Sequence, residues 1–181
     1  MWARDHARGL QTVVLSYAPD DGEGGWVEPF VGLIDGGVES LVTAHARTPG
    51  LARRHLRHTL IAGATRWDEP TLARQPAHDR AETLEVANAT LRWIDRAAPA
   101  FERRFGGSRD ALDALFNADH PLAARLLQHE LYRPLRGIAL RHLTRPADLL
   151  DAVNFHRDRM RDTGYWDVYG EQIRAFVMAI S

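Results

Sequence analysis

An apolar stretch with helical spacing at residues 121–163 constrains the fold of this chain more than any other feature. It reads PLAARLLQHELYRPLRGIALRHLTRPADLLDAVNFHRDRMRDT and is the longest helix-periodic pattern in the sequence. Helices with one apolar face have to bury that face against other elements. We therefore expect this stretch to form the core helices, with the rest of the chain packed around them.

The ends of these core helices are marked by residues with known capping preferences. Asp119 is placed to cap the first helix, and Pro134 is expected to interrupt it. Thr144 is expected to restart the second helix, with Pro146 in its first turn and Gly164 at its end.

Length and composition predict a soluble globular chain that needs no covalent staple. The 181 residues suit a single domain, residues 1–181, in which the proline-containing connector 64–78 is the best candidate hinge. Hydrophobic residues make up 45% and charged residues 26% of the chain, which is typical of globular proteins. Since there is no cysteine, disulfides, thiolate nucleophiles and zinc sites built on cysteine are excluded.

Charge and hydropathy indicate the class of partner. The formal net charge is -1, so no overall field attracts the chain to nucleic acid, which we do not expect as a partner. No apolar run reaches the roughly 18 residues of a membrane span, and the N-terminus lacks the apolar core of a signal peptide. We expect no membrane association and a cytoplasmic location.

All 23 basic residues are arginine. The simplest cause is the GC-rich composition of a bacterial genome, and the alternative is a surface adapted to bidentate contacts with carboxylates or phosphates. In either case, Schiff-base chemistry at a lysine and a P-loop lysine are excluded.

Residues 2–46 fit both helical and strand spacing, so their structure is ambiguous. In residues 2–17 a helical face containing Trp2, His6 and Leu10 competes with the strand propensity of Val13 and its neighbours, and we favour helix. Residues 26–46 also carry a helical stripe, with Glu39 outside it, although Asp-Gly-Gly at 35–37 resembles a hairpin turn. We favour helix there too. The alternative for residues 10–45 is a small N-terminal β-sheet of three strands.

The remaining periodic segments are all predicted to be helices, and the fold class is therefore mainly α, a single-domain bundle of about eight helices. These segments are 49–63, 79–97 ended by Pro99, 101–105, 109–117 capped by Ser108, and 167–180. In the helix 79–97 the apolar stripe expected to face inward is formed by Leu84, Ala87, Leu91 and Ile94, with Val86 and Trp93 beside it.

Common catalytic motifs are missing from the sequence. It has no glycine-rich phosphate loop, no G-x-S-x-G elbow, no H-E-x-x-H pair and no Glu-x-x-His pair of the di-iron bundles. Catalytic residues therefore remain unassigned, and we do not expect the chain to be an enzyme by itself.

Histidines inside apolar stripes are the basis of one functional hypothesis. His6, His45, His55 and His156 each lie on a predicted inward face, and Glu130 lies inside the apolar arc of its helix. Such side chains form metal or haem sites in helical bundles. The simpler interpretation, which we favour, is that each is a half-buried histidine bonded to a nearby polar group, so no cofactor is expected.

Arginines and aromatic residues on exposed segments are the basis of the other hypothesis. The predicted partner-binding residues are the arginine face of helix 49–63 and aromatic side chains at helix edges: Arg53, Arg54, Arg57, Trp67, Tyr165 and Trp166. We therefore expect a non-catalytic binding or adaptor protein, an accessory subunit that docks on a partner protein or enzyme and helps to present a peptide or protein substrate. The alternative function is a bundle enzyme with a metal ion or haem.

Overall fold

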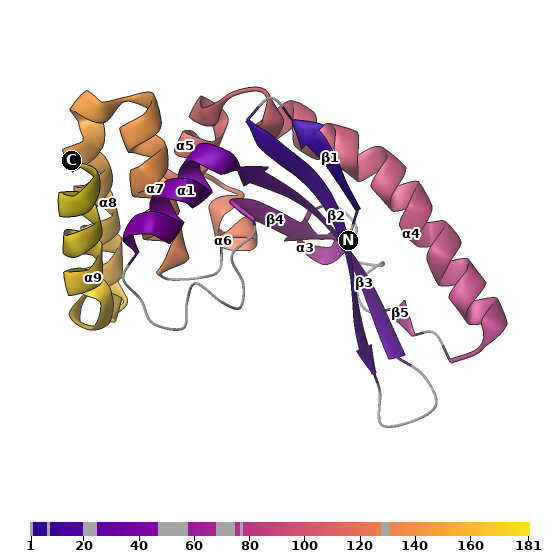
Figure 1. Cartoon of the computed structure of the whole chain (residues 1–181). Helices are drawn as coiled ribbons and strands as arrows, with labels where there is room; N and C mark the ends of the chain where they lie inside the picture. Colours follow the sequence, from indigo (N-terminus) through magenta and orange to yellow (C-terminus); the bar gives the residue numbers. More distant parts are fainter. Residues whose placement is uncertain are drawn as a thin grey trace.

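An antiparallel sheet formed by the N-terminal part of the chain lies beside a larger set of helices (Figure 1). The computed structural model describes residues 2–6, 8–19, 25–46, 58–67, 75–76, 78–127 and 131–181. The strands are β1 Trp2–His6, β2 Gly9–Pro19, β3 Gly25–Asp35, β4 Leu60–Gly63 and β5 Gln75–Pro76. Their order in the sheet is β1-β2-β3-β4, and β5 pairs with β3.

Strand structure at residues 2–6 and 9–19 shows that the helix predicted for residues 2–17 is wrong. The register pairs Leu10 with Ile34 and Val14 with Phe30, so β2 lies between β1 and β3. The β-branched residues at 12–14 favour a strand, and their apolar side chains satisfy helical and strand spacing equally well. Pairing with β3, which a search for local periodicity does not detect, decides between the two.

The segment 26–46 contains both of the structures that competed for it. Its first part is β3, and its second part is the helix α1, Gly36–His45. Asp35 ends the strand and caps the helix, because its Oδ1 accepts hydrogen bonds from the backbone N–H groups of Gly37 and Val38. Val38 and Val42 then face the core, as the helical stripe predicted.

Two further segments, 49–63 and 64–78, differ in structure from the prediction. The helix expected at 49–63 is wrong over residues 60–63, which form β4, while residues 47–57 lie outside the described part of the chain. In the connector, Ala64–Trp67 form a short helix, α3.

The helix α4, Arg80–Phe101, continues past the proline that was expected to end it. Pro99 lies inside α4, and the chain extends it as a π-helical turn, Glu102–Gly106. Phe101 and Phe105 are buried next to each other with ring centroids 5.3 Å apart, a contact that this continuation makes possible. The helix predicted at 109–117 is confirmed as α5, Arg109–Asn117, capped by Ser108.

The C-terminal helices follow the predicted pattern except at two caps. They are α6 Ala123–Leu126, α7 Tyr132–Thr144, the 3-10 turn Pro146–Asp148, α8 Leu149–Asp162 and α9 Tyr165–Ile180. Pro134 lies in the first turn of α7 and does not interrupt it, and Asp119 does not cap α6, whose N-cap is Leu122. The Thr144 hydroxyl donates back to the Leu140 carbonyl inside α7 and therefore starts no new helix.

The core is centred on α7, which confirms that the long apolar stretch organises the fold. Residues 132–140 are all buried, and α7 contacts α1, α5, α8 and α9. Gly164, with a φ of 75°, ends α8 as predicted, and Ile173, Phe176 and Ile180 of α9 are buried. The protein is thus mainly helical with a small sheet, broadly consistent with a bundle of about eight helices. Among the described residues, none of the helices has the length and hydropathy needed to cross a membrane.

Candidate functional site

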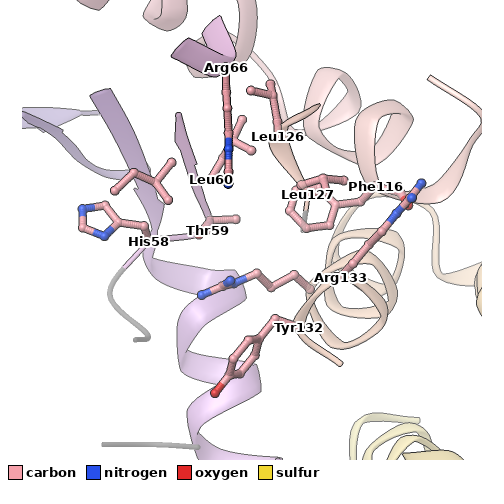
Figure 2. A pocket seen from close by; sticks show the side chains of 11 residues that line it. His58, Thr59, Leu60, Arg66, Phe116, Leu126, Leu127, Tyr132 and Arg133 are labelled. Carbon is pink, nitrogen blue, oxygen red and sulfur yellow. The ribbon is translucent and has the colours of Figure 1, made fainter. Parts of the chain in front are cut away.

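A cavity of about 200 Å³ lies where the sheet meets the C-terminal helices (Figure 2). Its walls come from β4, α3, α5, α6 and α7, so segments far apart in the sequence contribute to it. The lining residues are His58, Thr59, Leu60, Ile61, Arg66, Phe116, Leu126, Leu127, Tyr132, Arg133 and Arg136.

One wall of this cavity is apolar. Leu60, Phe116 and Leu126 are each at least 93% buried by the surrounding chain and form a fixed surface. Figure 2 shows Leu126, Leu127 and Phe116 on one side of the cavity and Leu60 opposite them. An apolar group placed between these residues would exchange water for close packing, which is the main favourable term in binding.

Two other lining residues, Thr59 and Arg136, bond to the buried carboxylate of Glu39, and we call these three residues the Glu39 network. Arg136 donates from Nε to Glu39 Oε1 at 2.9 Å and from Nη2 to Oε2 at 3.1 Å. The Thr59 hydroxyl donates to Glu39 Oε1 at 2.8 Å and accepts from the Asp35 backbone N–H at 2.9 Å. The charge of Arg136 is therefore already balanced, and its guanidinium also lies 5.4 Å from the Tyr132 ring centroid.

Arg66 differs from Arg136 because no carboxylate within the described part of the chain pairs with it. It is exposed, and Figure 2 shows its side chain extending from α3 toward Thr59 and Leu60. Its guanidinium thus brings to the cavity a positive charge that no carboxylate of the described residues balances.

Two other nitrogen-bearing side chains of the lining, Arg133 and His58, already have hydrogen-bond partners in the chain. Arg133 donates to the backbone carbonyls of Phe116 and Ala118, both at 3.2 Å, and thereby satisfies the C-terminal end of α5. His58 bonds through Nε2 to Thr12 Oγ1 at 2.8 Å. Burial, together with the positive charge of Arg136, lowers the pKa of His58, so this ring is neutral at pH 7.

The arginine and aromatic residues predicted to bind a partner are only partly visible. Arg53, Arg54 and Arg57 lie outside the described residues. Trp67 is half-buried and packs edge-on against Phe101 and Phe105, so it attaches the connector to the core.

The aromatic pair at the start of α9 lies on the surface, away from the cavity lining. Tyr165 is exposed and stacks on Tyr169 with ring centroids 6.2 Å apart. Trp166 is half-buried beneath the guanidinium of Arg174 and packs against Gly170. Their role in partner binding stays a prediction.

Of the histidines proposed as metal ligands, His156 has a hydrogen-bond partner for one of its two ring nitrogens, whereas its buried Nδ1 has none within the described part of the chain. His156 is completely buried in α8, and its Nε2 lies 2.7 Å from Asn117 Oδ1. His45 is half-buried in the last turn of α1. His55, Glu130 and the side chain of His6 lie outside the described residues. No group of three His, Asp or Glu that could hold a metal occurs among the described residues. The metal or haem alternative stays a prediction.

His156 belongs to a second polar cluster, which we call the Asp113 network. Asp113 accepts hydrogen bonds from Arg141 at 3.0 Å and from Asn117 at 2.6 Å, and it also pairs with Arg145. Asn117 in turn donates to the Gly137 carbonyl at 2.7 Å. This network lies between α5, α7 and α8 and forms none of the cavity lining.

The sequence interpretation missed Arg66 and Arg136, which line the cavity, and Glu39, which pairs with Arg136 behind it. Glu39 was placed outside the apolar stripe of its helix, but it is 91% buried. The arginines inside the predicted core helix could have indicated a buried carboxylate, since a buried arginine is usually paired with one. Local spacing could not identify that partner, because Glu39 and Arg136 are 97 residues apart.

Comparisons of this chain with protein-family models, with curated proteins and with solved structures gave no match. The function therefore has to be inferred from the cavity and from the charges around it. These charges favour a ligand that combines one acidic group with one apolar group.

Proposed function

We propose that this protein is a non-catalytic binding module that holds an acidic, partly apolar segment of a partner protein or peptide in the cavity between β4 and α7. The observation that carries the proposal is the guanidinium of Arg66, which lies above an apolar wall and pairs with no carboxylate in the part of the chain that the structure describes. In this role the chain acts as an adaptor or accessory subunit of a hetero-complex.

The volume of the cavity favours a side chain as the occupant. Pockets for drug-sized ligands measure about 300–1,000 Å³, whereas an apolar cavity of about 150 Å³ can hold a benzene ring. At about 200 Å³, the cavity suits one aromatic or branched aliphatic side chain. A protein partner can supply such an anchor and make its remaining contacts outside the cavity.

The charge balance favours one carboxylate on that partner. Arg136 is neutralised by Glu39, whereas Arg66 has no carboxylate among the described residues. Arginine binds a carboxylate through two parallel N–H donors, and this geometry gives direction as well as affinity. A carboxylate next to an apolar anchor would therefore contact Arg66 while the anchor fills the space beside Leu60 and Leu126.

The first experiment uses two small probes that differ only in charge. In an NMR titration, 3-phenylpropionate should shift the amide signals of Thr59, Leu60 and Leu126, and 3-phenylpropanamide should bind more weakly. Arg66→Gln should weaken binding of the acid by about tenfold, since a hydrogen bond to a charged group contributes about 1.5–3 kcal/mol.

Arg161→Gln serves as the matched control, because Arg161 is an exposed arginine of α8 that does not line the cavity. It should bind the acid as well as the wild type does. Binding of both probes with equal affinity, or equal affinity in the wild type and the Arg66 variant, would contradict the proposed role of the charge.

The second experiment tests the adaptor role itself. Tagged wild-type protein, the Arg66→Gln variant and the Arg161→Gln control are purified from the native source, and retained proteins are identified by mass spectrometry. A partner retained by the wild type and the control but lost from the Arg66 variant supports the proposal. A wild type that elutes as a monomer with no retained protein argues against it.

A further inference from the structure

The prediction of an inward-facing apolar stripe on α4 was only partly correct: Leu84, Ala87 and Leu91 face outward, whereas Ile94 packs against the core and the neighbouring Val86 and Trp93 are buried. Leu84 is 62% exposed and Leu91 is 58% exposed. The buried residues of α4 are Val86, Thr90, Trp93, Ala97, Ala98 and Phe101. The helix therefore has two apolar faces, one against the sheet and one toward solvent. Figure 1 shows α4 on the outer side of the sheet, which agrees with an exposed face.

The exposed face of α4 has an ordered sequence of residues. Arg80, Leu84, Ala87, Leu91 and Asp95 follow each other at steps of three or four residues, so they lie along one side of the helix. The spacing of the three apolar residues matches the seam along which two helices pack in a coiled coil. The positive charge stands at one end of this row and the negative charge at the other. We call this row the α4 stripe.

We propose that the α4 stripe binds the same stripe of a second copy of this chain, with the two helices antiparallel. A two-fold axis between Ala87 and Asn88 places Leu84 of one copy opposite Leu91 of the other. The same axis places Arg80 opposite Asp95, twice in the dimer. The stripe is thus complementary to itself in both shape and charge, as an interface with two-fold symmetry requires.

Three observations favour a second copy over an unrelated partner. Arg80 and Asp95 are both exposed, and neither forms an ion pair with another described residue. Their distances along the helix from the centre of the stripe are equal, which a two-fold axis demands and an unrelated surface does not. Ala87 at the centre is small, so the two helices can approach closely.

Sedimentation velocity over a wide range of protein concentration is the first test. We expect a weak monomer–dimer equilibrium, because two leucines and one alanine per copy form a small interface. Leu91→Glu should abolish the dimer, since it places an acidic group in the apolar centre. Met178→Glu on α9 is the matched control, because Met178 is 82% exposed and lies outside the stripe, and it should leave the equilibrium unchanged.

A charge exchange tests the antiparallel register. Arg80→Glu alone should weaken the dimer by about tenfold, because it opposes two acidic groups at both ends of the interface. The double variant Arg80→Glu with Asp95→Arg should restore wild-type affinity. A wild type that stays monomeric at all concentrations, or a double variant weaker than the single one, would overturn the proposal.

Disulfide trapping gives an independent test, since the chain has no cysteine of its own. Ala87→Cys should form a covalent dimer on oxidation, because the two Ala87 positions face each other across the axis. Leu84→Cys should not, because its two copies are separated by about 10 Å along the helices and a disulfide spans less than about 7 Å between Cα atoms. Equal cross-linking at both positions would instead indicate parallel helices and overturn the proposal.

Discussion

Two buried carboxylates pair with arginines of α7, and they show that the same ion pair can either stabilise the core or border a binding cavity. Asp113 of α5 pairs with Arg141, and Glu39 of α1 pairs with Arg136. Each carboxylate accepts a hydrogen bond from its arginine at about 3 Å and from at least one neutral side chain. The difference lies in their surroundings, because only the Glu39 network borders the cavity.

The Asp113 network is buried around its carboxylate, while Arg145 at its edge reaches the surface. Asp113 is fully buried, and hydrogen bonds connect it through Asn117 to His156, which is also fully buried. A Cβ at Gly137 would lie 2.4 Å from both Asn117 Oδ1 and His156 Nε2, so only glycine leaves room for these two side chains. No space remains for a ligand, and we assign this network to the stability of the helical core.

The Glu39 network is open on one side. Thr59 and Arg136 both line the cavity, so a bound anion or a water molecule can reach their polar atoms. A buried ion pair at the edge of a cavity can hold its neighbours in place and still respond to a ligand. Substitutions in the two networks should therefore differ in their effects on stability and on binding.

The largest effect is expected for Asp113→Ala. It leaves the partly buried Arg141 without its carboxylate, and breaking a buried ion pair costs about 3 kcal/mol or more in the free energy of unfolding. Urea denaturation measures this loss. Asp158→Ala is the control, because Asp158 is an exposed partner of Arg157 and its loss should change stability by less than about 0.5 kcal/mol. A similar small change for Asp113→Ala would show that the Asp113 network is not important for stability.

A smaller and pH-dependent effect is expected at His156. Burial, together with the positive charges of Arg133, Arg159 and Arg141, lowers the pKa of His156 to about 3. The unfolded chain has a histidine pKa near 6.5 and takes up a proton that the folded chain excludes. Stability from this group is therefore complete above about pH 6.5 and falls by about 1.4 kcal/mol for each pH unit below it.

The variant His156→Gln separates this contribution from those of the other histidines. Glutamine can still donate to Asn117 but does not titrate. Between pH 6 and pH 4.5, inside the window between these two pKa values, the slope of the free energy of unfolding against pH should therefore decrease by about one proton. Denaturation at several pH values measures the slope. His156→Leu, in contrast, leaves Asn117 Oδ1 without its donor and should cost about 2 kcal/mol even at neutral pH. Identical slopes for the wild type and the glutamine variant would contradict the buried, neutral state of this histidine.

Local contacts and contacts between distant segments differ in how well the sequence predicts them. Some features set by neighbouring residues were predicted correctly, such as the Ser108 cap and the Gly164 helix end, whereas the Asp119 cap and the helix end at Pro99 were not. Caps and one-sided apolar stripes depend on contacts within a few residues, so most of their signal lies in a short window.

Features set by distant partners were not predicted. The strand β2 was taken as helix because only its pairing with β3 excludes the helical interpretation. The buried face of α4 was only partly predicted because that helix carries two apolar faces and the sheet selects one of them. The candidate site was missed for the same reason. Glu39 of α1 pairs with Arg136 of α7, and Arg66 of α3 lines the cavity, only because folding brings these distant segments together.

The smallest effect on stability, and the most informative for function, is expected for Glu39→Gln. Glutamine keeps the shape of glutamate and can still accept from Thr59 Oγ1, and Arg136 keeps access to the cavity. Arg136 loses its counter-charge but lines the cavity, where water can solvate it, so we expect a loss of about 1 kcal/mol in the free energy of unfolding, below that for Asp113→Ala, which removes both carboxylate oxygens.

Binding should change in the opposite direction. Removing the charge of Glu39 leaves Arg136 unbalanced beside Arg66, so the cavity gains positive potential and 3-phenylpropionate should bind more tightly. NMR titration at constant salt measures this change, and Asp113→Asn is the control that should lower stability and leave the affinity unaltered. A lower affinity in the Glu39 variant would mean that Glu39 positions Arg136 for binding, and the network would then be a fixed part of the site. A higher affinity would show that Glu39 and the ligand compete for the same guanidinium, as an open network predicts.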